Sequence, residues 1–128
     1  MTGKLLDTNI IIALFADDVS VKEHLAKAEH VFIPAIALGE LYFGVHRSTE
    51  TDANCVRLND FASSSAVLVC GITTARHYGR IKNGLLKKGR PIPENDIWIA
   101  AIAMQYGLTA VTRDLHFDAI DGITIERW

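Results

Sequence analysis

The sequence predicts a single α/β domain, with helices on both faces of a mostly parallel five-stranded sheet, from three observations. Short segments rich in β-branched residues alternate with longer segments of helical periodicity. The short segments are apolar on both faces, which is typical of strands that are covered on both sides. A chain of 128 residues with 49% hydrophobic content is large enough for one core. No repeat, linker or low-complexity segment interrupts it, so the domain is predicted to span residues 1–128.

The first half of the chain is predicted to hold two strands and four helices. An apolar run at 10–15 closely follows the strand at 4–6 and is long enough to be the inner face of a helix. Asp7 or Thr8 is expected to cap that helix. The β-branched and aromatic content of 31–33, closed by a proline, predicts the second strand. Apolar spacing and turn signals place the helices at 10–15, 21–29, 35–47 and 49–63.

The second half is predicted to hold three strands and two long helices. Thr73 or Thr74 is expected to cap a helix that runs to about Lys88 and ends at Gly89. The two prolines of 91–93 then make a stiff connector. An apolar helix ending at a glycine follows that connector. The second helix is expected at 94–106, and the strands at 67–69, 109–112 and 123–125.

Composition and charge narrow the function classes. A formal net charge of -2 argues against a protein that coats nucleic acid generally. No apolar run approaches the ~20 residues that cross a bilayer, and the N-terminus carries no secretory signature. Cys55 and Cys70 lack metal-ligand or redox spacing and are predicted to be reduced thiols. A cytoplasmic protein without membrane attachment is therefore expected.

Four carboxylates stand where a parallel sheet gathers a ligand site. Asp7 follows the first strand and Asp114 the fourth, and loops at the carboxyl ends of such strands border the ligand crevice. Asp96 opens an alanine-rich helix that can approach the sheet closely. Glu40 has apolar helical neighbours, so it is predicted to point where water is scarce, which is costly for a lone carboxylate. Taken alone, each aspartate would also fit a helix cap, a first-turn acid or a turn residue.

Convergence of the four acids would require a cation. Two like charges about 4 Å apart repel by about 4 kcal/mol at an effective dielectric of 20. Ligation by oxygen atoms alone suits Mg²⁺, with Mn²⁺ as the alternative. Zinc is not predicted, because no metal-ligand spacing relates the five histidines, His24, His30, His46, His77 and His116.

Basic residues gather before the helix that Asp96 opens. The segment 71–93 contains no acid but carries nearly half of the 13 lysines and arginines. Such a segment either holds a phosphate backbone in a salt-dependent way or forms a solvated helix face. The candidates for RNA contact are Arg80 and Lys82, with Arg113 as a weaker third.

Four segments in combination resemble PIN domains of the VapC type, the ribonuclease toxins of bacterial and archaeal toxin–antitoxin pairs. The resemblance spans the whole chain. Its segments are LLDTNI at 5–10, LGELYFG at 38–44, YGRIKNGLLKKGRPIPENDIWIAAIA at 78–103 and VTRDLHF at 111–117.

The resemblance implies a sheet of order 3-2-1-4-5, which makes the first and fourth strands neighbours. It implies a Mg²⁺-dependent endoribonuclease whose catalytic and metal-binding residues are Asp7, Glu40, Asp96 and Asp114, supported by Thr8, Asn9 and Thr112. Metal-activated water would attack an RNA phosphodiester in line, leaving 5′-phosphate and 3′-hydroxyl ends.

Partners are also implied by the resemblance. A small cognate antitoxin is expected to block the crevice, and a homodimer is expected without assignment of its surface. The apolar residues proposed for the antitoxin groove, which would otherwise belong to the core, are Ile11, Leu14, Phe15, Leu41 and Tyr42.

Other functions stay open on the residues alone. Phosphatases with a nucleophilic aspartate after the first strand need a second acid where this chain has Asn9. Phospho-accepting receiver domains need a paired acid and a late lysine, neither of which is evident. A module that only binds RNA around a structural ion, or a nuclease that cuts DNA, is also compatible with these residues.

Overall fold

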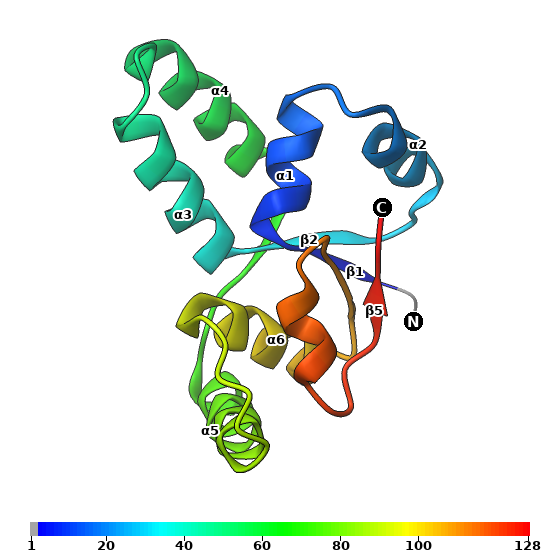
Figure 1. Ribbon diagram of the computed structural model, residues 1–128. Helices are drawn as coiled ribbons and strands as arrows, with labels where there is room; N and C mark the ends of the chain where they lie inside the picture. The colour runs from blue at the N-terminus through cyan, green and yellow to red at the C-terminus, as the bar shows by residue number, and fades with distance from the viewer. Residues whose placement is uncertain (1–2) are drawn as a thin grey trace.

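A five-stranded sheet runs through the centre of the protein, whose computed structural model describes residues 3–128 (Figure 1). The strands are β1 (Lys4–Leu6), β2 (Val31–Pro34), β3 (Ala66–Leu68), β4 (Thr109–Val111) and β5 (Ile125–Glu126). They lie in the order β3-β2-β1-β4-β5, and every pairing is parallel. The expected strand order is confirmed, and with it the adjacency of the first and fourth strands.

Side chains of the central strands alternate between two hydrophobic cores. Leu5 and Ala110 belong to one core and Leu6 and Val111 to the other, as the two-residue period of a strand requires. The first core packs against α5 (Ile72–Lys87), α6 (Glu94–Tyr106) and the 3₁₀ helix η1 (Leu115–Ala119). The second packs against α1 (Thr8–Phe15), α2 (Val19–Lys27), α3 (Ala35–His46) and α4 (Thr51–Ser63). Helices therefore cover both faces of the sheet, which confirms the three-layer fold.

The predicted elements are confirmed, with shifted ends that have local causes. The helix expected to be capped by Thr73 or Thr74 is instead preceded by Gly71. The Thr74 hydroxyl lies inside the first turn and accepts the Gly71 N–H at 2.9 Å. The last strand begins two residues and ends one residue beyond its predicted position, because Ile125 and Glu126 are the residues that pair with β4.

The strand order brings distant segments to the carboxyl edge of the sheet. β1 passes into α1 through Asp7, and β4 leads to Asp114, which begins η1. α3 follows β2 directly and carries Glu40, while the first turn of α6 carries Asp96. All four acids singled out in the sequence thus stand on loops or helices at this edge.

The two cysteines are free thiols, as predicted. Partial burial raises the pKa of the Cys70 thiol, so the thiol stays protonated at neutral pH. Among residues 3–128, no helix combines the length and the apolar character that crossing a membrane requires.

Candidate active site

Asp7 is the most buried of the four acids, with 4% of its surface exposed. One carboxylate oxygen accepts the Thr8 N–H at 2.8 Å and so caps α1. The other accepts the Thr112 hydroxyl at 2.7 Å. Burial raises the pKa of Asp7, while these two hydrogen bonds partly lower it. Asp7 therefore caps a helix and belongs to the acidic cluster at the same time.

The hydroxyl of Thr112 joins the loops that follow β1 and β4. It is fully buried, donates to Asp7 and accepts the Asp114 N–H at 2.9 Å. The Asn9 amide nitrogen lies 3.4 Å from both the Asp7 carboxylate and the Thr112 hydroxyl. The Asn9 oxygen accepts the Arg113 N–H at 3.2 Å. These contacts fix Asp7 relative to Asp114, and the supporting role expected of Asn9 and Thr112 stays a prediction.

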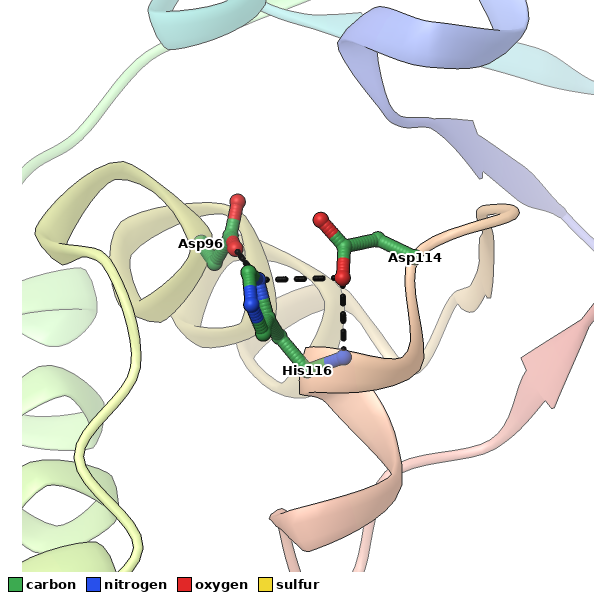
Figure 2. A group of neighbouring side chains, drawn as sticks. All are labelled: Asp96, Asp114 and His116. Carbon is green, nitrogen blue, oxygen red and sulfur yellow. Dashed lines mark hydrogen bonds and ion pairs between the residues drawn. The ribbon is translucent and has the colours of Figure 1, made fainter.

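Sequence reasoning missed His116, which the structure places between two of the acids (Figure 2). Its Nδ1 atom lies 2.9 Å from Asp96 Oδ2 and 3.0 Å from Asp114 Oδ1. Asp114 Oδ1 also accepts the His116 backbone N–H at 2.9 Å and so caps η1. The available signal was the spacing of Asp114 and His116, because a capping aspartate folds the chain back over its own side chain. The imidazole nitrogen therefore lies among acids for which the sequence had suggested oxygen ligands alone.

The carboxylate of Asp96 has a strongly raised pKa. Burial raises the pKa of Asp96 to about 6, and the charges of Asp7 and Asp114 add to the rise. The hydrogen bond from His116 opposes it. Asp96 thus titrates well above the ordinary range of an aspartate.

Glu40 stands at the rim of the cluster. Burial raises the pKa of Glu40 and the Asp7 charge adds to the rise, whereas the side chains of Thr8 and Asn95 oppose it. Glu40 is only half-buried and lines an open cavity of about 420 Å³ together with Asn95. The prediction that Glu40 points where water is scarce is therefore only partly confirmed.

The residues at this edge suit a divalent cation. Ligand atoms of Asp96, Asp114 and His116 all lie within 4.8 Å of one another. Asp7 is close enough to repel both aspartates. Within residues 3–128, no lysine or arginine forms an ion pair with any of the four acids. The buried Thr8 hydroxyl also lacks a hydrogen-bond partner of standard geometry in this part of the chain. Several close carboxylates that have no lysine or arginine partner are what a bound cation would neutralise.

The basic candidates for RNA contact lie apart from one another. Lys82 faces the start of α6, where its ammonium group lies 2.6 Å from Glu94 Oε1. Arg80 lines a cavity beside Thr109, at the opposite edge of the sheet from the acids. Arg113 is held by Asp18 at 3.0 Å and donates to a backbone carbonyl at 2.8 Å. Arg80 and Lys82 therefore occupy different faces of α5, and all three RNA contacts stay predictions.

The sequence matches the profile of the PIN domain over residues 4–123. The chain belongs to this family. The parallel sheet and the acidic carboxyl edge described above are thus features of a PIN domain in this chain, and the match covers every element that carries a site acid.

Relatives of this PIN domain are VapC proteins. It is 33% identical to Ribonuclease VapC2 of Haemophilus influenzae, over 100% of this chain and 99% of the relative. It is also 33% identical to the tRNA(fMet)-specific endonuclease VapC of Salmonella typhimurium, over 97% of this chain and 96% of the relative. Its structure resembles that of VapBC2 from Rickettsia felis, solved bound to a promoter DNA fragment, with a TM-score of 0.91, 30% identity and 99% coverage of both chains.

Proposed function

We propose that this PIN domain is a divalent-metal-dependent endoribonuclease that acts as the toxin of a toxin–antitoxin pair. The observation that carries the proposal is the convergence of Asp7, Asp96 and Asp114 without a lysine or arginine partner among the described residues. The relatives named Ribonuclease VapC, which match over nearly the whole chain, support RNA as the substrate. A cytoplasmic location, where RNA is accessible, forms part of the proposal.

Each residue of the cluster has a role in the proposed hydrolysis. Asp7 and Asp96 would hold the cation directly, and Asp114 and Glu40 directly or through water. Mg²⁺ or Mn²⁺, when bound, lowers the pKa of water and neutralises charge that develops on the phosphate. Hydrolysis forms a bond between water oxygen and phosphorus and breaks the bond from phosphorus to the 3′ oxygen. The products then carry 5′-phosphate and 3′-hydroxyl ends.

The supporting residues hold the acids ready for this reaction. The Thr112 hydroxyl donates to Asp7 and so ties that carboxylate to the residue that follows β4. The Asp114 N–H is committed to Thr112, so the loop after β4 cannot swing away without loss of a buried hydrogen bond. Preorganisation of this kind means that little rearrangement is required when substrate binds.

Cleavage of RNA by Asp96→Asn protein tests the assignment. Loss of a ligand is expected to lower the rate more than about 100-fold, since even residues behind the ligands contribute 10- to 100-fold in metal sites. Asp52→Asn is the matched control, because Asp52 is an exposed first-turn acid of α4 just as Asp96 is a first-turn acid of α6. Undiminished, chelator-resistant cleavage by folded Asp96→Asn protein would overturn the proposal.

The same assay separates the alternative functions. RNA and DNA of the same sequence are incubated with the protein and Mg²⁺, and the ends of the products are identified. Cleavage of DNA in preference to RNA would make the chain a DNA nuclease. Binding of RNA without cleavage would indicate a non-catalytic RNA-binding module. Capture of beryllofluoride at Asp7 would favour a phosphatase or a phospho-accepting receiver domain.

A groove between α1, α3 and α4 is the proposed binding site of the antitoxin. It encloses about 290 Å³ and is lined by Phe15 and Leu41, two of the five residues suggested for the antitoxin groove, together with the exposed Ile12. Ile11 is fully buried and is removed from the expected groove. Solved relatives include VapBC assemblies, one of them from Salmonella typhimurium with a TM-score of 0.91 and 33% identity. A homodimer also stays part of the proposal.

Substitution of Ile12 by aspartate tests the groove. We expect the protein to retain RNA cleavage and to lose co-purification with the product of the neighbouring gene. Val19→Asp is the control, because Val19 is a comparably exposed aliphatic residue at the start of α2, outside the groove. Equal retention of the partner by the two variants would place the antitoxin elsewhere.

A further inference from the structure

His116 offers a nitrogen atom to the centre of the acidic edge. Its Nδ1 atom lies within 3.0 Å of one oxygen of Asp96 and one of Asp114 (Figure 2). These two acids stand on α6 and at the start of η1, so the imidazole is the group that bridges them. A single Nδ1–H cannot point fully at both oxygens, so one of the two contacts lacks good hydrogen-bond alignment.

Two of the three separations among these atoms equal the distance between neighbouring ligands around a metal ion, and all three atoms lie within 4.8 Å of one another. An octahedral ion with bonds of about 2.1 Å sets adjacent ligand atoms about 3.0 Å apart. The two measured separations from Nδ1 are 2.9 and 3.0 Å. A cation beside the three atoms would therefore replace the shared hydrogen with a bond to nitrogen and require little movement of the imidazole.

The local fold holds the imidazole in this position. Asp114 Oδ1 accepts the backbone N–H of His116, which fixes the start of η1. The next residue, Phe117, is fully buried in the core between the sheet, α5 and α6. A bond to Asp114 on one side and a buried anchor on the other limit the positions open to His116. Its side chain remains 47% exposed, so the nitrogen is accessible to an ion from solvent.

We propose that His116 is a nitrogen ligand of the active-site cation and that it makes the site favour Mn²⁺ over Mg²⁺. The inference rests on the proposed metal-dependent function and specifies the metal. Mg²⁺ is strongly selective for oxygen, whereas imidazole suits divalent ions of the first transition row. Carboxylate ligands alone would accept both ions. The mixed nitrogen and oxygen set supplies the discrimination.

Binding of the two ions to purified protein without RNA tests the preference. Titration calorimetry gives dissociation constants for Mn²⁺ and Mg²⁺ with the wild-type protein, with His116→Asn and with His30→Asn. His30 is the control because it is exposed and precedes β2, at the opposite edge of the sheet. We expect the Mg²⁺ to Mn²⁺ ratio of dissociation constants to fall about tenfold in His116→Asn, and not in His30→Asn. An unchanged ratio in His116→Asn would overturn the proposal.

Electron spin echo measurements on bound Mn²⁺ test the bond itself. A directly bound imidazole gives modulation from ¹⁴N, which we expect in the wild-type and His30→Asn proteins and not in His116→Asn. A purely structural role of His116 would leave no such signal in any of them, and that result would overturn the proposal. The Asp96→Asn protein distinguishes failure of the His116 proposal from failure of the proposed nuclease function. Loss of Mn²⁺ binding there, with RNA cleavage by the wild type but no nitrogen signal, rejects the histidine and retains the nuclease.

Discussion

The carboxylates of this protein fall into two groups that the fold treats in opposite ways. One group lies around the periphery, where each acid has a lysine or arginine within 3.0 Å and a lowered pKa; its members are Asp17, Asp18, Glu94 and Glu126. The Val21 N–H contributes most to the lowered pKa of Asp18, and a lysine contributes most for the other three. The other lies at the carboxyl edge of the sheet, where burial raises the pKa of each acid; its members are Asp7, Glu40 and Asp96.

The two groups differ in whether the protein itself neutralises the charge of the carboxylate. Peripheral acids are neutralised by side chains of the protein itself. At the edge, Asp7 is held by neutral donors instead, the Thr8 N–H and the Thr112 hydroxyl, and within residues 3–128 no lysine or arginine pairs with Asp7, Asp96 or Glu40. Neutral donors orient a carboxylate and leave its charge uncompensated. The edge is therefore a region in which the protein keeps negative charge available for an external cation at a cost in free energy of unfolding.

Removal of the Thr112 hydroxyl is expected to have the largest effect on stability. Thr112→Val deprives the buried Asp7 of one of its neutral donors and leaves the Asp114 N–H without its acceptor. Loss of a hydrogen bond to a buried charge predicts a decrease of about 3 kcal/mol in the free energy of unfolding at pH 8. Urea denaturation measures it, with Thr109→Val at the other end of β4 as control. A decrease below about 1 kcal/mol would contradict this account of how the edge is held.

Binding of a divalent cation is expected to raise the free energy of unfolding by a comparable amount. Mn²⁺ at 100 times its dissociation constant should raise the free energy of unfolding by about 2.7 kcal/mol, provided that it binds only the folded state. Thermal denaturation with and without chelator measures the shift. Asp96→Asn should abolish the shift and Glu94→Gln should preserve it, because Glu94 belongs to the paired group. An equal loss in both variants would mean that the two groups of acids do not differ.

The periodicity of the sequence predicted the layers and the elements well, and it predicted the edge less well. Apolar runs such as Leu5 and Leu6 predicted a strand buried on both faces, and the two cores confirm it. The adjacency of β1 and β4 required a family resemblance, because strand order arises from packing between segments about 100 residues apart. Sequence neighbours of Glu40 predicted burial, yet the open cavity between α3 and Asn95 decides its exposure.

The directions in which the side chains of the site point could not be predicted from the sequence. His116 follows Asp114 by two residues, and its importance depends on the turn by which η1 directs the imidazole back toward Asp96. Lys82 and Arg80 lie in one basic segment but face opposite ways on α5. Spacing of charges along a chain does not specify their partners. The ion pair between Lys82 and Glu94 forms only because α6 packs beside α5.

A neutral substitution at Asp96 is expected to stabilise the metal-free protein modestly. The pKa of Asp96 is about 6 in the folded state against the ordinary 3.8 of an aspartate, so the folded state binds more protons between these values. Stability of the wild type should therefore fall as pH rises from about 4 to 6 and stay lower above 6. Asp96→Asn removes this cost, with a gain of roughly 1 kcal/mol after allowance for solvent screening. Chemical denaturation in chelator at pH 8 and pH 4 measures it, and a gain that persists at pH 4 would contradict the cause.

Release of Lys82 from its partner is expected to give the smallest effect, on the binding of RNA. Glu94 holds the Lys82 ammonium at 2.6 Å, and the Tyr78 hydroxyl lies 3.2 Å from the same nitrogen. Glu94→Gln should free one positive charge beside the start of α6 and add one phosphate contact. The plot of log K against log salt concentration should then steepen by about 0.7, the value for one contact to a single strand.

Fluorescence anisotropy with single-stranded RNA in chelator measures this slope without cleavage. Asp17→Asn is the matched control, because it likewise removes one acid and frees one lysine, Lys22, from an exposed pair at 2.7 Å. That pair lies beyond the end of α1, while Asp7 precedes the start of the same helix. The control slope should stay at the wild-type value, since a freed charge there gains no phosphate. Equal steepening in both variants would show that RNA responds to net charge alone, and Lys82 would lose its assignment.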